Sequence, residues 1–216
     1  MPVPLGVFQK LKSEYGICSS WAVWVEEERK PLKASVHDTS IFDLESNPSL
    51  LDELQNDYVL VALNFSTDIA EKTNWQEFDN FHSGKTDWKI RHALIGSPLW
   101  GCYMTDFLKN FPNLKAKDAK KQMEKVENRE KYEKNVRDFE NELAILGAEN
   151  SPLIAFGREV EYFLRKEFPE KKIVYVPHYA SPNAYENGKK IDTNNGEDYK
   201  REVIKQLVSE LNLRAW

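Results

Sequence analysis

The chain has 216 residues, of which 41% are hydrophobic, 12% aromatic and 30% charged, and its formal net charge is −5. This length fits one ordinary domain with a sizeable core, so we expect residues 1–216 to form a single folded domain, and the apolar content excludes a disordered chain. The acidic charge argues against a generic nucleic-acid binder, so any DNA contact has to come from a local basic patch.

The composition also bears on membranes, metals and cellular location. The longest apolar stretches, such as residues 59–63, fall far short of the roughly 20 residues that a membrane helix needs, and residues 1–12 lack the pattern of a secretory signal. We therefore expect a cytoplasmic protein without a membrane partner. Cys18 and Cys102 cannot hold zinc or an iron–sulfur cluster unaided. We expect two reduced, buried thiols, no metal and no cofactor.

The N-terminal half alternates helical and strand patterns. Its sharpest transition is the apolar run 57–63, which changes abruptly to the polar group 64–68, as in a buried parallel strand that ends in a loop. The other elements that the pattern predicts there are a helix over 5–15, a strand over 19–25, a polar turn over 26–33, a helix over 88–95 and a strand over 100–105.

The C-terminal half begins with a highly charged segment, residues 117–146. Its apolar positions recur three and four apart from Tyr132 to Leu146, which predicts one long helix whose early part stands in water. Further along, the pattern predicts a strand over 152–157, a helix over 158–168, a strand over 172–177, a loop marked by 187–188 and 194–196, and a helix over 199–213.

Strands that alternate with helices predict an α/β fold with right-handed crossovers. We expect a three-layer α/β/α sandwich around a central, mostly parallel four-stranded sheet. In such sheets, ligands bind outside the carboxyl ends of the strands. Polar side chains stand at three of these ends, namely Asn64, Thr105 with Asp106, and His178.

Two of these strand ends resemble motifs of the uracil-DNA glycosylase superfamily. Residues 59–66, Val-Leu-Val-Ala-Leu-Asn-Phe-Ser, resemble its first motif, a buried strand ending in Gly-x-Asn-Pro-Gly/Ser, and residues 178–182, His-Tyr-Ala-Ser-Pro, resemble its second, His-Pro-Ser-Pro. Residues 80–94, 100–112 and 142–164 are similar to the intervening segments of the mismatch-type members. The resemblance covers about residues 57–182 and implies the fold of that family and excision of a base from DNA.

The resemblance also implies roles for individual residues. Hydrolysis of an N-glycosidic bond separates positive charge on the sugar from negative charge on the leaving base. Asn64 is expected to orient water and His178 to donate a hydrogen bond to the leaving base. The remaining expected site residues are Phe81, Asp106 and, as the alternative stacking ring, Phe65 for the base, and Ser66, Ser181, Lys85 and Lys89 for phosphate or DNA.

The chain departs from the family motifs at four positions, Ala62, Phe65, Asp106 and Tyr179. Asp106 stands where several members read the uracil edge with an asparagine. An amide both donates and accepts hydrogen bonds, whereas an ionised Asp only accepts. Asp106 therefore indicates a different base, a protein that has lost the reaction, or a cap for the following turn.

Structural roles compete with the functional ones. Asn64 is also a typical turn residue, His178 a typical hydrogen-bonded core imidazole and Phe81 a typical packing ring. Four lysines between residues 115 and 121 either contact phosphates or form a solvated helix face.

The leading functional prediction is a monomeric DNA glycosylase. We expect it to be monofunctional, because no lysine stands at a motif position to form a Schiff base. The alternative is a module that binds a free nucleobase, a nucleotide or DNA without cleaving it. The third prediction, an interaction protein that uses the charged helix, ranks last.

Overall fold

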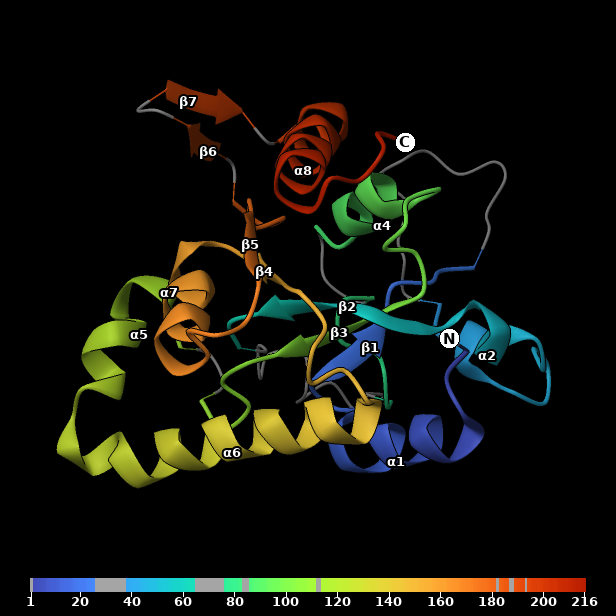
Figure 1. Ribbon diagram of the computed structural model, residues 1–216, viewed down its shortest axis with the longest axis horizontal. Coiled ribbons are helices and arrows are strands. Elements are labelled where there is room, and N and C mark those ends of the chain that lie inside the picture. Colours follow the sequence, from blue (N-terminus) through green and yellow to red (C-terminus); the bar gives the residue numbers. More distant parts are fainter. Residues whose placement is uncertain are drawn as a thin grey trace.

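The computed structural model describes residues 2–25, 38–64, 76–82, 86–111, 114–181, 183–186, 189–192 and 194–216. Within these residues the chain forms an α/β fold around a five-stranded sheet in the order β1-β3-β2-β4-β5 (Figure 1). The strands are β1 Ser19–Trp21, β2 Gln55–Ala62, β3 Cys102–Asp106, β4 Leu153–Phe156 and β5 Ile173–Val176.

The expectation of four strands was wrong by one. β2, β3, β4 and β5 are parallel, and β1 adds an antiparallel edge strand against β3, with Ser19 opposite Thr105. β1 is also shorter than the predicted strand over 19–25. An aromatic, β-branched run shows strand propensity but does not show which edge of a sheet it joins.

The parallel register brings four strand ends together at one edge of the sheet. Ala62 pairs with Asp106, Val61 with Ala155, and Phe156 with Val176. The residues that follow β2, β4 and β5, and the last residue of β3, therefore share this carboxyl edge.

Helices cover both faces of the sheet (Figure 1). Alternate side chains of β2 divide between two hydrophobic cores, with Val59 and Val61 in one and Leu60 and Ala62 in the other. The first core is covered by α1 Leu5–Tyr15, α5 Ala116–Met123, α6 Arg129–Leu146 and α7 Arg158–Glu167, and the second by α4 Trp88–Leu94 and α8 Gly196–Leu211. The short helix α2 Leu50–Glu53 precedes β2.

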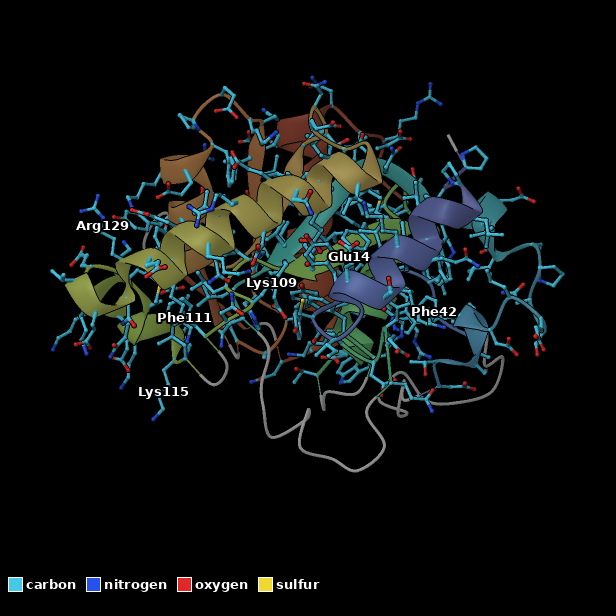
Figure 2. All side chains as sticks on the ribbon, turned by 90° about the horizontal axis from the view of Figure 1, so that it is seen from below. Glu14, Phe42, Lys109, Phe111, Lys115 and Arg129 are labelled. Carbon is cyan, nitrogen blue, oxygen red and sulfur yellow. The ribbon has the colours of Figure 1, made fainter. Side chains whose placement is uncertain are left out.

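A buried ion pair joins α6 to the end of β3. Glu142 is fully buried, and its Oε2 lies 2.7 Å from Nζ of Lys109. Its Oε1 accepts hydrogen bonds from Tyr103 at 2.8 Å and from Thr105 at 2.7 Å. Lys109 also donates to the carbonyl of Asp106. Viewed from below, Lys109 lies between α1 and α6 (Figure 2).

The charged segment 117–146 is not one helix. α5 ends at Met123, a 3-10 turn occupies Val126–Asn128, and α6 starts at Arg129. Asn128 donates from its side chain to the carbonyl of Gln122 at 2.8 Å, which fixes this turn. Because α5 still buries Ala119 and Met123, the early part of the segment packs more closely than its sequence predicts.

The predicted loop after residue 182 contains a hairpin, β6 Asn183–Glu186 and β7 Lys189–Asp192, with residues 187–188 between its strands. An Asn-Gly pair between two short runs is a strong hairpin signal. The two cysteines are free and buried, as expected, and burial raises the pKa of the Cys18 thiol to about 12. None of the helices in the described part of the chain has the length and apolar character to cross a bilayer.

Candidate functional site

A cavity of about 580 Å³ lies at the carboxyl edge of the sheet. The ends of β2, β4 and β5 and the first residues of α5 and α7 surround it. Its lining includes Leu63, Asn64, Gly157, Arg158, Tyr175 and His178. We call it the strand-end cavity. It brings together the amide and the imidazole that the sequence places at the ends of two different strands.

Asn64 follows the end of β2 and is half-buried. Its Nδ2 donates to the carbonyl of Phe111 at 3.2 Å. This contact distinguishes the two ends of the carboxamide, because only the nitrogen can donate. The oxygen, which has two lone pairs, is the atom suited to accept a hydrogen bond from water.

His178 follows the end of β5 and is also half-buried. Its Nδ1 accepts a hydrogen bond from the backbone amide of Ala180 at 3.1 Å. Burial and the positive charge of Lys89 lower the pKa of His178 to about 4. At neutral pH the ring is therefore uncharged, with its proton on Nε2, and it can donate a hydrogen bond from that atom.

Gly157 sets the spacing between β4, α7 and His178. Its φ of +103° lies in a region that side chains rarely adopt, and its amide donates to the carbonyl of Val176 at 3.0 Å. A Cβ added to Gly157 would lie 3.5 Å from the Cβ of His178. The glycine therefore lets the chain turn from β4 into α7 directly beside the imidazole.

Aromatic rings pack behind the imidazole. Tyr179 stacks on His178 with ring centroids 4.4 Å apart, and its ring meets Phe81 and Phe156 edge-on at 6.5 Å and 5.6 Å. Phe81 is 2% exposed, and it is not among the residues that line the strand-end cavity. Its φ of +67° is rare for a bulky residue and is a form of strain that concentrates at functional sites.

Asp106 ends β3 and is 1% exposed. Its Oδ2 accepts a hydrogen bond from the side-chain amide of Asn80 at 2.8 Å. Burial raises the pKa of Asp106 to about 7, although the hydrogen bond from Asn80 and the positive charge of Lys109 oppose that rise. Asp106 is therefore partly protonated near neutral pH. The negative charges of Asp87 and Asp106 in turn add to the effect of burial in raising the pKa of Tyr179.

The other predicted site residues fall into two groups. Ser181 lines the strand-end cavity, whereas Lys89 is only 4% exposed and acts on His178 through its charge. Phe65, Ser66 and Lys85 lie outside the described residues.

The sequence analysis did not predict that residues at the end of β4 and the start of α7 line the strand-end cavity. Arg158 lies over the ring of Tyr175, 3.5 Å from its centroid, and its guanidinium lies 2.7 Å from Glu161. The signal was present, because Gly157 follows an apolar strand and precedes a helix, and the rule for parallel sheets applies to this strand end as well.

No family model, curated protein or solved structure matches the chain. Among the described residues, no group of three or more His, Cys, Asp or Glu side chains is arranged to hold a metal ion. The polar side chains that line the strand-end cavity are the amide of Asn64, the imidazole of His178, the guanidinium of Arg158, the carboxylate of Glu159 and the hydroxyl groups of Tyr175 and Ser181.

Proposed function

We propose that the chain is a monofunctional DNA glycosylase of the uracil-DNA glycosylase type. It hydrolyses the N-glycosidic bond of a damaged or mispaired base that has turned out of the DNA into the strand-end cavity. The observation that carries the proposal is that Asn64 and His178, from two separate motifs, line one cavity of about 580 Å³. This volume falls within the range of small-molecule sites and is large enough for a nucleobase.

The neutral state of His178 suits this reaction. The departing base becomes an anion, and a fixed N–H donor in a partly desolvated site stabilises the charge that develops on its oxygen. Nδ1 accepts from Ala180, so Nε2 is the donor. The imidazole needs no positive charge for this role, which agrees with the lowering of its pKa to about 4.

Asn64 supplies the complementary function on the sugar side. An amide oxygen can hold water near C1′ but has almost no strength as a base. The bond to the base must therefore be largely broken before water attacks. The hydrogen bond from Nδ2 to the carbonyl of Phe111 supports this role, because it holds the amide in one orientation.

Asp106 is given no contact with the base in this proposal. It is 1% exposed and is not among the residues that line the strand-end cavity, and its Oδ2 already accepts a hydrogen bond from Asn80. The identity of the base is therefore left to the choice of oligonucleotides in the test.

The proposal is tested with oligonucleotides that carry uracil, hypoxanthine, xanthine or a mismatch, followed by alkali treatment to break the strand at abasic sites. We expect strand breaks at one or more of these bases. Because removal of one transition-state donor costs about 10²–10³ in rate, His178→Ala should lose that much, and Asn64→Ala should also be impaired. Lys10→Ala, at an exposed position of α1, serves as the matched control.

The same screen separates cleavage from binding. If no base is excised but free bases still bind in calorimetric titrations and Asn64→Ala and His178→Ala weaken that binding, the alternative of a non-catalytic nucleobase-binding module replaces the proposal. If neither excision nor binding is found, both functions are wrong.

A further inference from the structure

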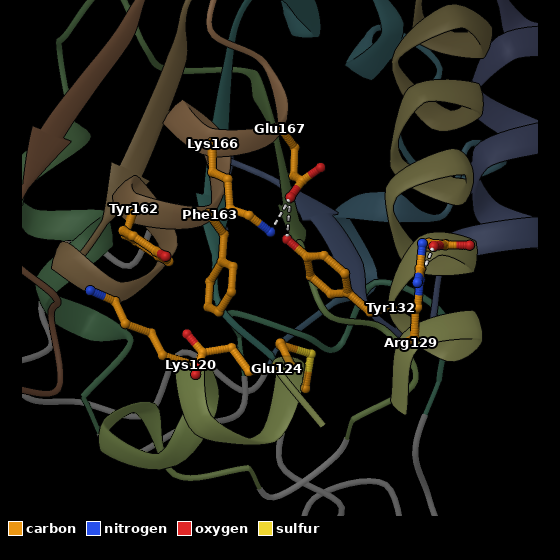
Figure 3. Close-up of a pocket in the computed structure, with 10 residues that line it drawn as sticks. Lys120, Glu124, Arg129, Tyr132, Tyr162, Phe163, Lys166 and Glu167 are labelled. Carbon is orange, nitrogen blue, oxygen red and sulfur yellow. Dashed lines mark hydrogen bonds and ion pairs between the residues drawn. The ribbon is translucent and has the colours of Figure 1, made fainter. Parts of the chain in front are cut away.

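A second cavity, of about 280 Å³, lies where α5, α6 and α7 meet (Figure 3). Its lining contains three cations, Lys120, Arg129 and Lys166, three carboxylates, Glu124, Glu133 and Glu167, and the rings of Tyr132, Tyr162 and Phe163. We call it the seam cavity, because it lies beside the contact between α5 and α7. It is not part of the site described above.

The two cavities share the same two helices. On α5, Ala116 lines the strand-end cavity and Lys120 the seam cavity. On α7, Arg158 lines the first, and Tyr162 and Lys166 line the second. Residues four apart lie on one face of a helix, about 6 Å further along its axis. The seam cavity therefore lies about one helical turn from the strand-end cavity along both helices.

Positive groups lie against aromatic rings at the seam cavity. Nζ of Lys120 lies 3.7 Å from the centroid of the Tyr162 ring, and Nζ of Lys166 lies 5.0 Å from that of Tyr132. In Figure 3, Lys120 extends beneath Tyr162, while Glu167 accepts a hydrogen bond from the hydroxyl group of Tyr132 and pairs with Lys166. Tyr162 remains 39% exposed. Arg129 and Lys166 are paired with Glu133 and Glu167, so Lys120 beside the exposed ring of Tyr162 is the combination suited to a flanking base and its phosphate.

The charge of α5 and its flanks differs from that of the whole chain. Residues 114–125 contain five lysines and two acidic residues, a net charge of +3, whereas the complete chain carries −5. Lys115, Lys117, Lys120 and Lys121 are exposed. Figure 2 shows Lys115 and Arg129 at the same end of the molecule, pointing outward. This is the local basic patch that an acidic protein needs for contact with phosphates.

We propose that the seam between α5 and α7 binds single-stranded DNA, with a base that flanks the target stacked on Tyr162 and the intervening phosphates beside the lysines of α5. The identity of the ligand rests on the proposed function, in which the target nucleotide occupies the strand-end cavity. A single strand is favoured over a duplex because stacking on a side chain needs a base whose face is not covered by its neighbours.

The test is fluorescence anisotropy with a labelled, undamaged single-stranded oligonucleotide of about 15 nucleotides and the intact protein. Because a stacked base contributes substantially to binding, Tyr162→Ala should weaken it by about 5-fold or more, whereas Tyr162→Phe, which keeps the ring, should bind as the wild type does. Lys120→Glu should weaken binding and lower its dependence on salt. Lys10→Glu, an equivalent charge reversal on α1, should change it little.

The outcomes separate this inference from the proposed function. If a base is excised but Tyr162→Ala and Lys120→Glu bind the strand as the wild type does, the seam inference is wrong and the glycosylase stands. If both variants bind weakly but no base is excised, the seam holds and the glycosylase fails. Tighter binding of a duplex than of a single strand by the wild type overturns the assignment to single-stranded DNA.

Discussion

Replacing Glu142 with glutamine, which has nearly the same shape, should strongly lower the free energy of unfolding. Its carboxylate is fully buried, pairs with Lys109 at 2.7 Å and accepts hydrogen bonds from Tyr103 and Thr105. Burial alone would lower the pKa of Lys109, but the interactions with Glu142, Cys18 and Asp106 together outweigh that effect, and the pKa lies above its usual value. Glu142→Gln keeps an acceptor for the two hydroxyl groups and leaves the ammonium group without its counter-charge.

Breaking a buried ion pair by neutralising one partner costs about 3–5 kcal/mol. Domains are stable by only about 5–15 kcal/mol, so this loss takes a large share of the total. For a chain of this length, each kcal/mol shifts the melting temperature by roughly 2–4 °C, so we expect Glu142→Gln to lower it by about 6–20 °C. Circular dichroism during heating and during urea titration measures both quantities.

The control is Glu140→Gln, on the exposed face of the same helix, for which we expect a change within about 0.5 kcal/mol. Lys109→Met combined with Glu142→Gln should cost less than the sum of the two single changes, because it removes both charges together. Equal stability of the two glutamine variants would refute the reasoning.

Three further predictions concern the surroundings of the site. Gly157→Ala should destabilise the protein by about 1–3 kcal/mol in urea titrations, because alanine is strained at a φ of +103°, and no loss would contradict this. His82 is fully buried with a pKa of about 3, so below pH 6.5 the unfolded chain binds a proton that the native protein cannot. Stability should therefore fall as the pH drops from 6.5, by at most about 1.4 kcal/mol per pH unit from this group, and His82→Phe should flatten the slope measured by urea titration. Asn80→Ala removes the hydrogen bond that lowers the pKa of Asp106, so infrared titration of the carboxyl group should give a value above about 7, and an unchanged value would show that the bond has no such effect.

Most helices and strands could be predicted from the sequence, because the strands are short apolar runs between clear breaks. The helix at residues 5–15 matches α1, and the strand over 172–177 matches β5 within one or two residues at each end. The break inside 117–146 was missed because it contains neither glycine nor proline. A hydrogen bond from Asn128 to the carbonyl of Gln122 spans the break, and helical periodicity carries no information about such a bond.

The positions of the site residues at the strand ends could be predicted, because the topology of a parallel sheet determines them. Parallel strands place Asn64 and His178 at one edge, and the structure brings both to the same cavity. The charge states were not predictable, because the pKa of Asp106 depends on burial and on Asn80, which lies 26 positions away in the sequence. The contribution of Arg158 depends likewise on its packing over Tyr175.

The central claim is that a nucleobase occupies the strand-end cavity beside a neutral His178. Long-range ¹⁵N NMR of the imidazole groups tests it most directly, since the chain has four histidines and His178→Gln assigns the signal. We predict that His178 carries its proton on Nε2 at pH 7 and that this nitrogen shifts when uracil, hypoxanthine or xanthine is added. An imidazole that titrates near pH 6.5, or an Nε2 signal that no base changes, would contradict the account.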